Sequence, residues 1–302
     1  MTLKEDILKL KVKKNALILS HLYELDEIQE IADIVGDSYF LSKKALESTN
    51  DLIVFCGVQF MAESAKILSP SKKILIPSNE TTCPMADMAS LEKLEILKDK
   101  HPNSKIVTYI NSNLDIKAVS DVCVTSSSAK NILANIDEEE IIFLPDRNLG
   151  EYLQEQNPNK KFILYNGFCP THERIDKEEI VNLKNKYKDF KVLVHPECNK
   201  GVRDLADFIG STSELINYSA SSPFKGFIVL TEEGVLYQMK LKSPSKTFIK
   251  TTTGMICPNM KKITLENLYA CLLNEEYEII LNEDLRVKAL KSLENMHRLS
   301  SK

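Results

Sequence analysis

The chain has 302 residues, 43% of them hydrophobic, so it can bury a large core and form two or three compact domains rather than a disordered chain. Its formal net charge of -4 lacks the basic excess of a nucleic-acid-binding protein, so we expect a small-molecule partner and no nucleic acid. No stretch approaches the roughly 20 apolar residues that span a bilayer, and the N-terminus lacks a signal-peptide core. We therefore expect no membrane partner, a cytoplasmic location, and seven cysteines that serve as thiols or metal ligands rather than disulfides.

Helical and strand-like segments alternate from the start of the chain. Residues 4–15 have an amphipathic helical pattern, and Val- and Ile-rich runs of strand length follow it. These runs lie at residues 15–24, 32–38, 51–57 and 72–84. The last of them passes through a polar turn to Cys83 and Pro84. Such alternation is typical of a parallel sheet built from βαβ units.

The same order of elements recurs twice, displaced by about 88 and then about 86 residues. The matching runs lie at 104–113 and 190–199, at 120–126 and 206–212, at 139–145 and 225–231, and at 160–170 and 246–258. One match of this kind would be uninformative, because strands of α/β proteins resemble one another. Four matches at one pair of shifts indicate a triplicated unit, and helical segments at 91–102 and 176–188 precede the later copies as 4–15 precedes the first.

The repeat predicts an α/β fold of three pseudo-three-fold-related αβα sandwich domains, each with a four-stranded parallel sheet, around a central active-site cavity. We expect the first domain at residues 1–84, joined by C-terminal helices at 264–302, the second at 85–171 and the third at 172–260.

Polar residues follow the strands of every copy, at the sheet edge where ligands of open parallel sheets bind. They are His21, Tyr23, Asp37, Ser38 and Cys83 in the first copy, Tyr109, Asn111, Thr125, Ser126 and Cys169 in the second, and His195, Glu197, Ser211, Thr212 and Cys257 in the third. A three-fold arrangement brings these sets around one cavity.

Three of the cysteines, Cys83, Cys169 and Cys257, occupy equivalent positions before proline, so one axis can gather them into a metal site. Three thiolates favour an iron–sulfur cubane with one open iron, and zinc with an open position is the alternative. Cys56, Cys123 and Cys271 are interpreted as buried structural thiols.

The histidines and hydroxyls of these sets allow two interpretations. His21 and His195, with Tyr23, Tyr109 and Glu197, are suited to proton transfer in dehydration or carbon–carbon bond formation, although single histidines are usually structural. The hydroxyl groups of the second-strand ends fit helix caps, and they also fit phosphate or carboxylate binding. The sequence contains no G-x-G-x-x-G or Walker-type loop, so we expect no nucleotide cofactor.

Nearly the whole chain resembles the quinolinate synthase (quinolinate synthetase A) family. The resemblance is carried by IADIVGDS (31–38), FMAESAKIL (60–68), TTCPMA (81–86), YINSN (109–113), PDRNLGEY (145–152), GFCPTH (167–172), HPEC (195–198), IGST (209–212) and CPNMKKITLEN (257–267). It implies condensation of iminoaspartate with dihydroxyacetone phosphate in NAD biosynthesis, with an aspartate oxidase or dehydrogenase as the supplier of iminoaspartate. It also implies a [4Fe-4S] cluster on Cys83, Cys169 and Cys257, whose open iron binds substrate as a Lewis acid.

The resemblance further implies roles for individual residues. Glu197 would be the general acid/base, with His21, Tyr23, Tyr109 and His195 around the reacting carbons. Carboxylate or phosphate groups would be bound by Ser38, Asn111, Ser126, Ser211 and Thr212, with His172 as a further candidate. Cys198 is left outside the cluster, because packing and site lining are both open to it.

This sequence departs from the family at three places. Leu22 stands where the family usually has Asn, and Phe168 where it usually has His. Met260 and Ile263 replace two cysteines of a Cys-x-x-Cys-x-x-Cys run found in some members, so we predict no disulfide switch there. A non-catalytic iron–sulfur sensor or small-acid-binding protein, and a zinc hydrolase, remain the alternative functions.

Overall fold

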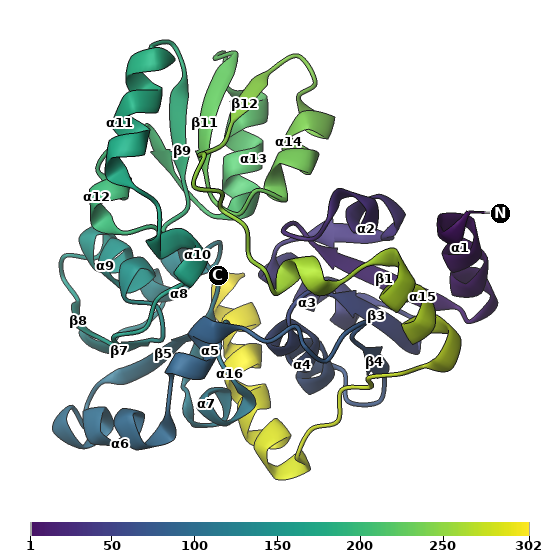
Figure 1. The fold of residues 1–302 in the computed structure, drawn as a ribbon. Coiled ribbons are helices and arrows are strands. Elements are labelled where there is room, and N and C mark those ends of the chain that lie inside the picture. The colour runs from purple at the N-terminus through teal and green to yellow at the C-terminus, as the bar shows by residue number, and fades with distance from the viewer. Residues whose placement is uncertain (1, 302) are drawn as a thin grey trace.

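The computed structural model describes residues 2–301 and contains three four-stranded sheets in which all strands are parallel (Figure 1). The predicted α/β fold with three four-stranded parallel sheets is therefore confirmed. We call each sheet with its helices a unit and number the units in chain order. The strand orders are β2-β1-β3-β4, β6-β5-β7-β8 and β10-β9-β11-β12, so the topology is the same in every unit.

The bounds of the elements follow the expected repeat. The first unit contains α1 (Leu3–Lys13), β1 (Ala16–His21), α2 (Asp26–Ile31), β2 (Ile34–Gly36), α3 (Ser38–Glu47), β3 (Leu52–Cys56), α4 (Gln59–Leu68) and β4 (Lys73–Leu75). Next come α5 (Pro84–Met88), α6 (Leu91–Lys100), β5 (Lys105–Tyr109), α7 (Leu114–Val119), β6 (Val122–Val124), α8 (Ala129–Ala134), β7 (Glu140–Leu144), α9 (Arg147–Gln156) and β8 (Lys161–Leu164).

The third unit contains α10 (Pro170–Glu173), α11 (Lys177–Lys186), β9 (Lys191–Val194), α12 (Lys200–Arg203), β10 (Phe208–Ile209), α13 (Thr212–Ser221), β11 (Gly226–Leu230), α14 (Val235–Lys242) and β12 (Thr247–Ile249). The chain ends in η1 (Met260–Lys262), α15 (Leu265–Asn274) and α16 (Glu283–Ser300). Within residues 2–301, no helix has the length and apolar character needed to cross a membrane.

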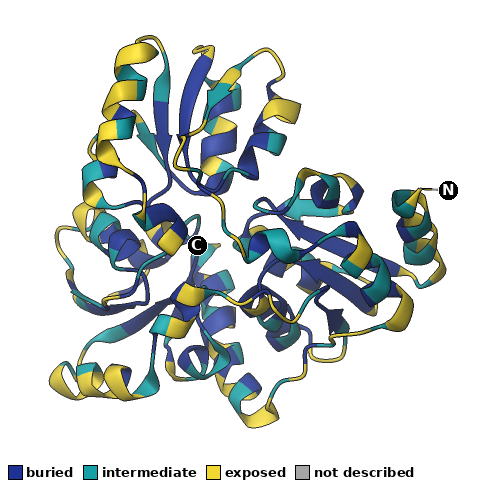
Figure 2. Ribbon diagram, viewed as in Figure 1, coloured by how far each residue is buried: buried dark blue, intermediate teal, exposed yellow. Residues whose placement is uncertain are grey.

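The central strands are mostly apolar, as expected for sheets that are covered by helices on both faces. Every residue of β3 and of β11 is buried, and the strands lie in the interior of each unit while the exposed residues lie on the outer helices (Figure 2). This arrangement leaves the strand ends, rather than the sheet faces, accessible to a ligand.

One aspartate holds the first and second strands together in each unit. The Oδ2 atoms of Asp33, Asp121 and Asp207 accept hydrogen bonds from the backbone N–H groups of the first strands at 2.8, 2.9 and 2.8 Å. Each of these aspartates also donates its own N–H to the same strand residue. The aspartate is therefore the physical reason why the segments at 32–38, 120–126 and 206–212 align.

A lysine before each fourth strand is repeated in the same way. Lys72, Lys160 and Lys246 donate through Nζ to backbone carbonyl groups at the end of, or just after, the helix that precedes the third strand of the same unit (α3, α8 and α13). A cation near the end of a helix satisfies carbonyl groups that have no partner within the helix. The lysine therefore joins the start of each fourth strand to the segment that leads into the third strand.

The C-terminal helices pack on more than one unit. Helix α15 lies against α1, whereas α16 packs on α7, α8 and β6 of the second unit and on α4 of the first. Asn282 caps α16 by accepting from the backbone N–H of Leu285, and the buried residues Ala289, Leu293 and Met296 recur at helical spacing. In Figure 1, α16 (yellow) runs between the first two units. The borders expected after residues 84, 171 and 260 fall within α5, α10 and η1.

Leu293→Ala tests the packing of α16. The side chain of Leu293 is fully buried in the core that joins the first two units, so its truncation should lower the free energy of unfolding by about 2 to 5 kcal/mol. Val287→Ala on the same helix is the control, because Val287 is 53% exposed and its truncation should change stability by less than about 0.5 kcal/mol. Equal effects in urea unfolding would contradict the packing described.

Candidate functional site

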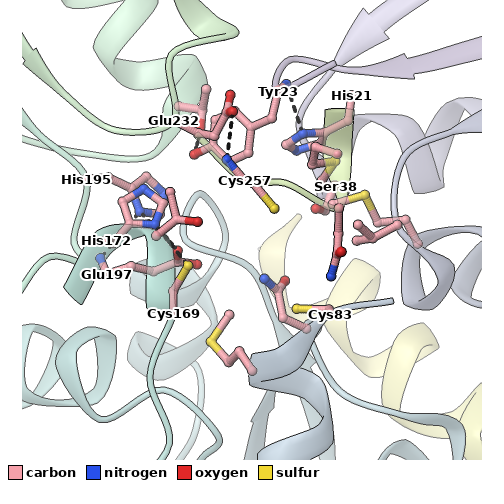
Figure 3. A pocket seen from close by; sticks show the side chains of 18 of the residues that line it. His21, Tyr23, Ser38, Cys83, Cys169, His172, His195, Glu197, Glu232 and Cys257 are labelled. Carbon is pink, nitrogen blue, oxygen red and sulfur yellow. Dashed lines mark hydrogen bonds and ion pairs between the residues drawn. The ribbon is translucent and has the colours of Figure 1, made fainter. Parts of the chain in front are cut away.

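The carboxyl ends of strands from all three units surround one cavity of about 180 Å³ (Figure 3). Thirteen of the sequence-predicted site residues line it, and His172 is among them. These lining residues are His21, Tyr23, Ser38, Cys83, Tyr109, Asn111, Ser126, Cys169, His172, His195, Glu197, Thr212 and Cys257. Ser211 does not line the cavity; its hydroxyl group accepts from the backbone N–H of Glu214 in the capping box of α13.

The three cysteine loops are held by the same backbone hydrogen bond. The residue at the start of α4, of α9 and before α14 donates its N–H to the carbonyl group two residues before the cysteine. The pairs are Gln59 with Thr81, Arg147 with Gly167, and Glu233 with Met255, at 2.8, 2.8 and 2.9 Å. Cys83, Cys169 and Cys257 therefore follow equivalent backbone hydrogen bonds, and their side chains lie around the same cavity in Figure 3.

Cys83 and Cys169 are the N-cap residues of α5 and α10, each of which begins with proline, whereas Cys257 lies three residues before η1. Burial raises the pKa of all three thiols, to about 12 for Cys83, while nearby backbone N–H groups act in the opposite direction. The thiols are therefore protonated without a cation beside them. A bound metal centre would supply the positive charge that lets them ionise, and the helix N-termini would stabilise the thiolates.

Two buried carboxyl groups behind the cysteines were missed by sequence reasoning. Asp146 Oδ2 and Glu232 Oε1 accept from the backbone N–H groups of Cys169 and Cys257, both at 3.1 Å. Both residues are fully buried, and Glu232 also pairs with Lys261 at 3.0 Å. They lie two residues after the third strands of the second and third units, where the first unit has Val58. The signal that could have revealed them in the sequence is an acidic residue at this position in two of the three repeats.

The two histidines at first-strand ends share one hydrogen-bonding pattern. Nδ1 of His21 accepts from the backbone N–H of Tyr23 at 3.2 Å, and Nδ1 of His195 accepts from that of Glu197 at 3.3 Å. Burial lowers the pKa of each imidazole to about 3. Both rings are therefore neutral and carry their proton on Nε2, which makes each a hydrogen-bond donor at that atom.

Glu197 is the carboxylate at the centre of the site. Tyr109 donates through Oη to Oε1 at 2.6 Å, and His172 Nδ1 lies 2.8 Å from Oε2. Burial alone would raise the pKa of Glu197, but attraction to His172 and hydrogen bonds from His172 and Tyr109 lower it to about 2. The carboxylate is therefore ionised, while burial and the charge of Glu197 raise the pKa of Tyr109 and keep its hydroxyl group protonated.

A chain of hydroxyl groups connects this carboxylate to the first unit. His172 Nε2 lies 3.0 Å from Thr231 Oγ1, which lies 2.8 Å from the hydroxyl oxygen of Tyr23. Tyr23 is also hydrogen-bonded to Thr212 at 2.8 Å. The tyrosines of the first and second units thus approach the same histidine–carboxylate pair of the third from opposite sides.

The hydroxyl residues at second-strand ends differ in their local roles. Asp37, rather than Ser38, caps α3 by accepting from the backbone N–H of Phe40, so the expected capping role does not fall on Ser38. Ser126 precedes α8, whose capping position is Ser128, and lines the cavity. Ser38 and Ser126 are therefore not needed as helix caps, and their hydroxyl groups are left for a ligand.

The donor atoms of the site suit a metal centre. Sγ of Cys169, a ring nitrogen of His172 and a carboxylate oxygen of Glu197 all lie within 4.8 Å of one another. This mixed set is one that zinc accepts, whereas the three cysteines together offer the all-sulfur set that an iron–sulfur centre prefers. The residues present fit a metal centre in either form.

The fold and the cavity define an α/β enzyme in which three parallel-sheet units contribute to one thiol-lined site. The chain belongs to the quinolinate synthetase A family, whose model, described as "Quinolinate synthetase A protein", matches residues 5–298. A quinolinate synthase of Clostridium perfringens (strain 13 / Type A) is 56% identical over 99% of this chain and 99% of its own length. Those of Clostridioides difficile (strain 630) and Caldicellulosiruptor saccharolyticus are 53% and 51% identical, and each alignment covers at least 97% of both chains.

The two departures from the family near the site have packing roles. Leu22 is buried in the core of the third unit, where it contacts a cluster that includes Leu215 and Phe227. The Phe168 ring lies under the guanidinium group of Arg147, 4.6 Å from its centroid. Leu22 therefore adds an apolar contact between the first and third units, and Phe168 adds a cation–π contact with Arg147.

The neutral histidines predict a pH-dependent stability. His21 and His195 stay neutral in the folded protein down to about pH 3, whereas each takes up a proton near pH 6.5 when unfolded. Because the unfolded chain binds more protons, the free energy of unfolding should fall as pH decreases from about 6.5, by up to about 1.4 kcal/mol per pH unit for each histidine. In urea unfolding of the metal-free protein, His195→Gln should reduce this slope; an unchanged slope would contradict the assignment.

Proposed function

We propose that the protein synthesises quinolinate by condensing iminoaspartate with dihydroxyacetone phosphate, with loss of phosphate and water, in NAD biosynthesis. The main support is that three cysteines, one from each sheet unit, line the same cavity as the ionised Glu197 and its partners Tyr109 and His172. Membership of the quinolinate synthetase A family supports the same reaction. An aspartate-oxidising enzyme would supply the unstable imine.

The proposed cofactor is a [4Fe-4S] cluster held by Cys83, Cys169 and Cys257, with one iron left open. Bound there, it would supply a Lewis acid that polarises an oxygen of the substrate. The equivalent positions of the three thiols on one cavity and the helix N-termini beside them support this assignment. Asp146 and Glu232 would hold the backbone of two ligands in place.

The cavity offers hydrogen-bond donors that would bind the anionic groups of the substrates. His21 and His195, neutral and protonated at Nε2, would donate to a carboxylate or phosphate group. Among residues 2–301, the buried Oδ1 atom of Asn111 has no hydrogen-bond partner, which supports a ligand role, because buried polar atoms are normally paired. The remaining proposed contacts are the hydroxyl groups of Ser38, Ser126 and Thr212, whereas Ser211 caps α13 and does not line the cavity.

Proton transfer is assigned to the residues around Glu197. Its ionised carboxylate would take a proton from the substrate as general base and return it as general acid. Tyr109 donates to the carboxylate, and Tyr23 reaches the same pair through Thr231 and His172. The hydroxyl groups of both tyrosines line the cavity and would orient the reacting carbons.

Replacing any one of Cys83, Cys169 or Cys257 with Ala should remove the brown cluster absorbance and quinolinate formation together, because three ligands are needed to retain the cluster. Cys123→Ala is the matched control, since Cys123 is fully buried and bonded to Ser292 rather than placed on the cavity. Metal analysis and spectra of anaerobically purified protein are the measurements. Zinc in place of iron, or full activity in a ligand variant, would overturn the cofactor proposal.

Glu197→Gln should lower turnover by about 10²- to 10⁴-fold while cluster content and substrate binding persist, because the amide retains the size of the side chain but cannot accept the proton. Glu233→Gln is the control, since Glu233 pairs with Lys250 outside the cavity lining. Steady-state kinetics on cluster-loaded protein check the result. Unchanged turnover would show that Glu197 is not the general base and would favour a non-catalytic binding role for this residue.

A further inference from the structure

Asn148 is a buried residue that lies behind the site and reaches two of its parts at once. It belongs to α9 of the second unit, is 3% exposed and is not part of the cavity lining. Its side-chain nitrogen donates to the backbone carbonyl oxygen of Glu197 at 3.0 Å and to Glu173 Oε2 at 2.8 Å. Both hydrogens of the amide group are thus used on the third unit.

The two acceptors belong to the two segments that carry the histidine–carboxylate pair. Glu173 follows His172 on α10, the short helix that begins after Cys169. Its other carboxylate oxygen accepts from Arg147 at 2.6 Å, so the helix is held to α9 by two donors. Asn148 therefore fixes the backbone of Glu197 relative to the helix that presents His172.

A second interaction secures the next peptide. Arg203, itself 3% exposed, donates through Nη1 to the carbonyl oxygen of Cys198 at 2.8 Å and to that of Asn148 at 3.0 Å. The carbonyl groups of two consecutive residues, Glu197 and Cys198, are thus both bound to donors on or tied to α9. This gives the loop that carries Glu197 little freedom to shift relative to the second unit.

We propose that Asn148 is a positioning residue for the reaction. By binding the backbone of Glu197 and the helix α10, which carries His172, it holds the Glu197 carboxylate against His172. The inference rests on the proposed function, since it assigns Asn148 to the same proton-transfer step. Asn148 touches no cavity space, so it acts only through Glu197 and His172. A small displacement of a general base costs rate far more than it costs substrate binding.

Asn148→Ala should lower kcat by about 10-fold or more while KM changes by less than about 3-fold and iron content per chain stays at the wild-type level. Asn166→Ala is the matched control. Asn166 is exposed, and its Oδ1 atom accepts from Nη1 of Arg147 at 3.1 Å. Its truncation therefore perturbs the hydrogen bonds of Arg147 without removing a contact to Glu197. Asn148→Ser, which keeps one donor and leaves a smaller void, should give an intermediate kcat and replaces the Ala variant if that chain does not fold.

A double-mutant cycle separates positioning from a general structural role. In the Glu197→Gln background, Asn148→Ala should reduce the residual kcat by less than about 2-fold, because the group through which it acts is already gone. A full further 10-fold loss, a wild-type kcat in the single variant, or a rise in KM alone would overturn the proposal. If the wild-type protein itself forms no quinolinate when loaded with its cluster, the proposed function fails instead, and the two failures are distinguishable.

Discussion

The structure depends on one recurring constraint, the backbone hydrogen bond that ties each cysteine loop to the start of the preceding helix. In a parallel sheet the strand ends leave peptide groups without partners in the sheet, and something outside it must satisfy them. Gln59, Arg147 and Glu233 do so with the same geometry in the three units. Because this hydrogen bond is repeated, three thiols that are distant in sequence lie on one cavity, where together they can act as metal ligands.

The three-fold repeat is broken wherever chemistry requires different groups. The first and third units have neutral histidines at the ends of their first strands, each accepting a backbone N–H at Nδ1, while the second unit has Tyr109 there. Acidic residues lie behind Cys169 and Cys257, but Val58 occupies that place behind Cys83. A cavity built from three equivalent units therefore presents different side chains on its three sides.

Much of this arrangement could be predicted from the sequence because the signals were repeated. The strand runs, the Cys-Pro turns and the polar strand ends recur at fixed displacements, and repetition separates them from ordinary α/β patterns. Contacts that occur once carry no such signal. Asn148 on α9 and His172 on α10 contact Glu197 directly, whereas Thr231 is connected to it through His172, and only the fold shows that these residues meet. Ser38 and Asp37 show the same limit, since either could cap α3 and their order along the chain does not decide it.

The central claim is that the three cysteines share one iron–sulfur cluster whose open iron faces the substrate site. It is tested most directly by the Mössbauer spectrum of anaerobically prepared, ⁵⁷Fe-loaded protein, recorded with and without quinolinate. The account predicts a [4Fe-4S] spectrum in which a single iron changes its parameters on addition of the ligand. A spectrum without a cluster, or one in which every iron is unaffected by the ligand, would contradict it.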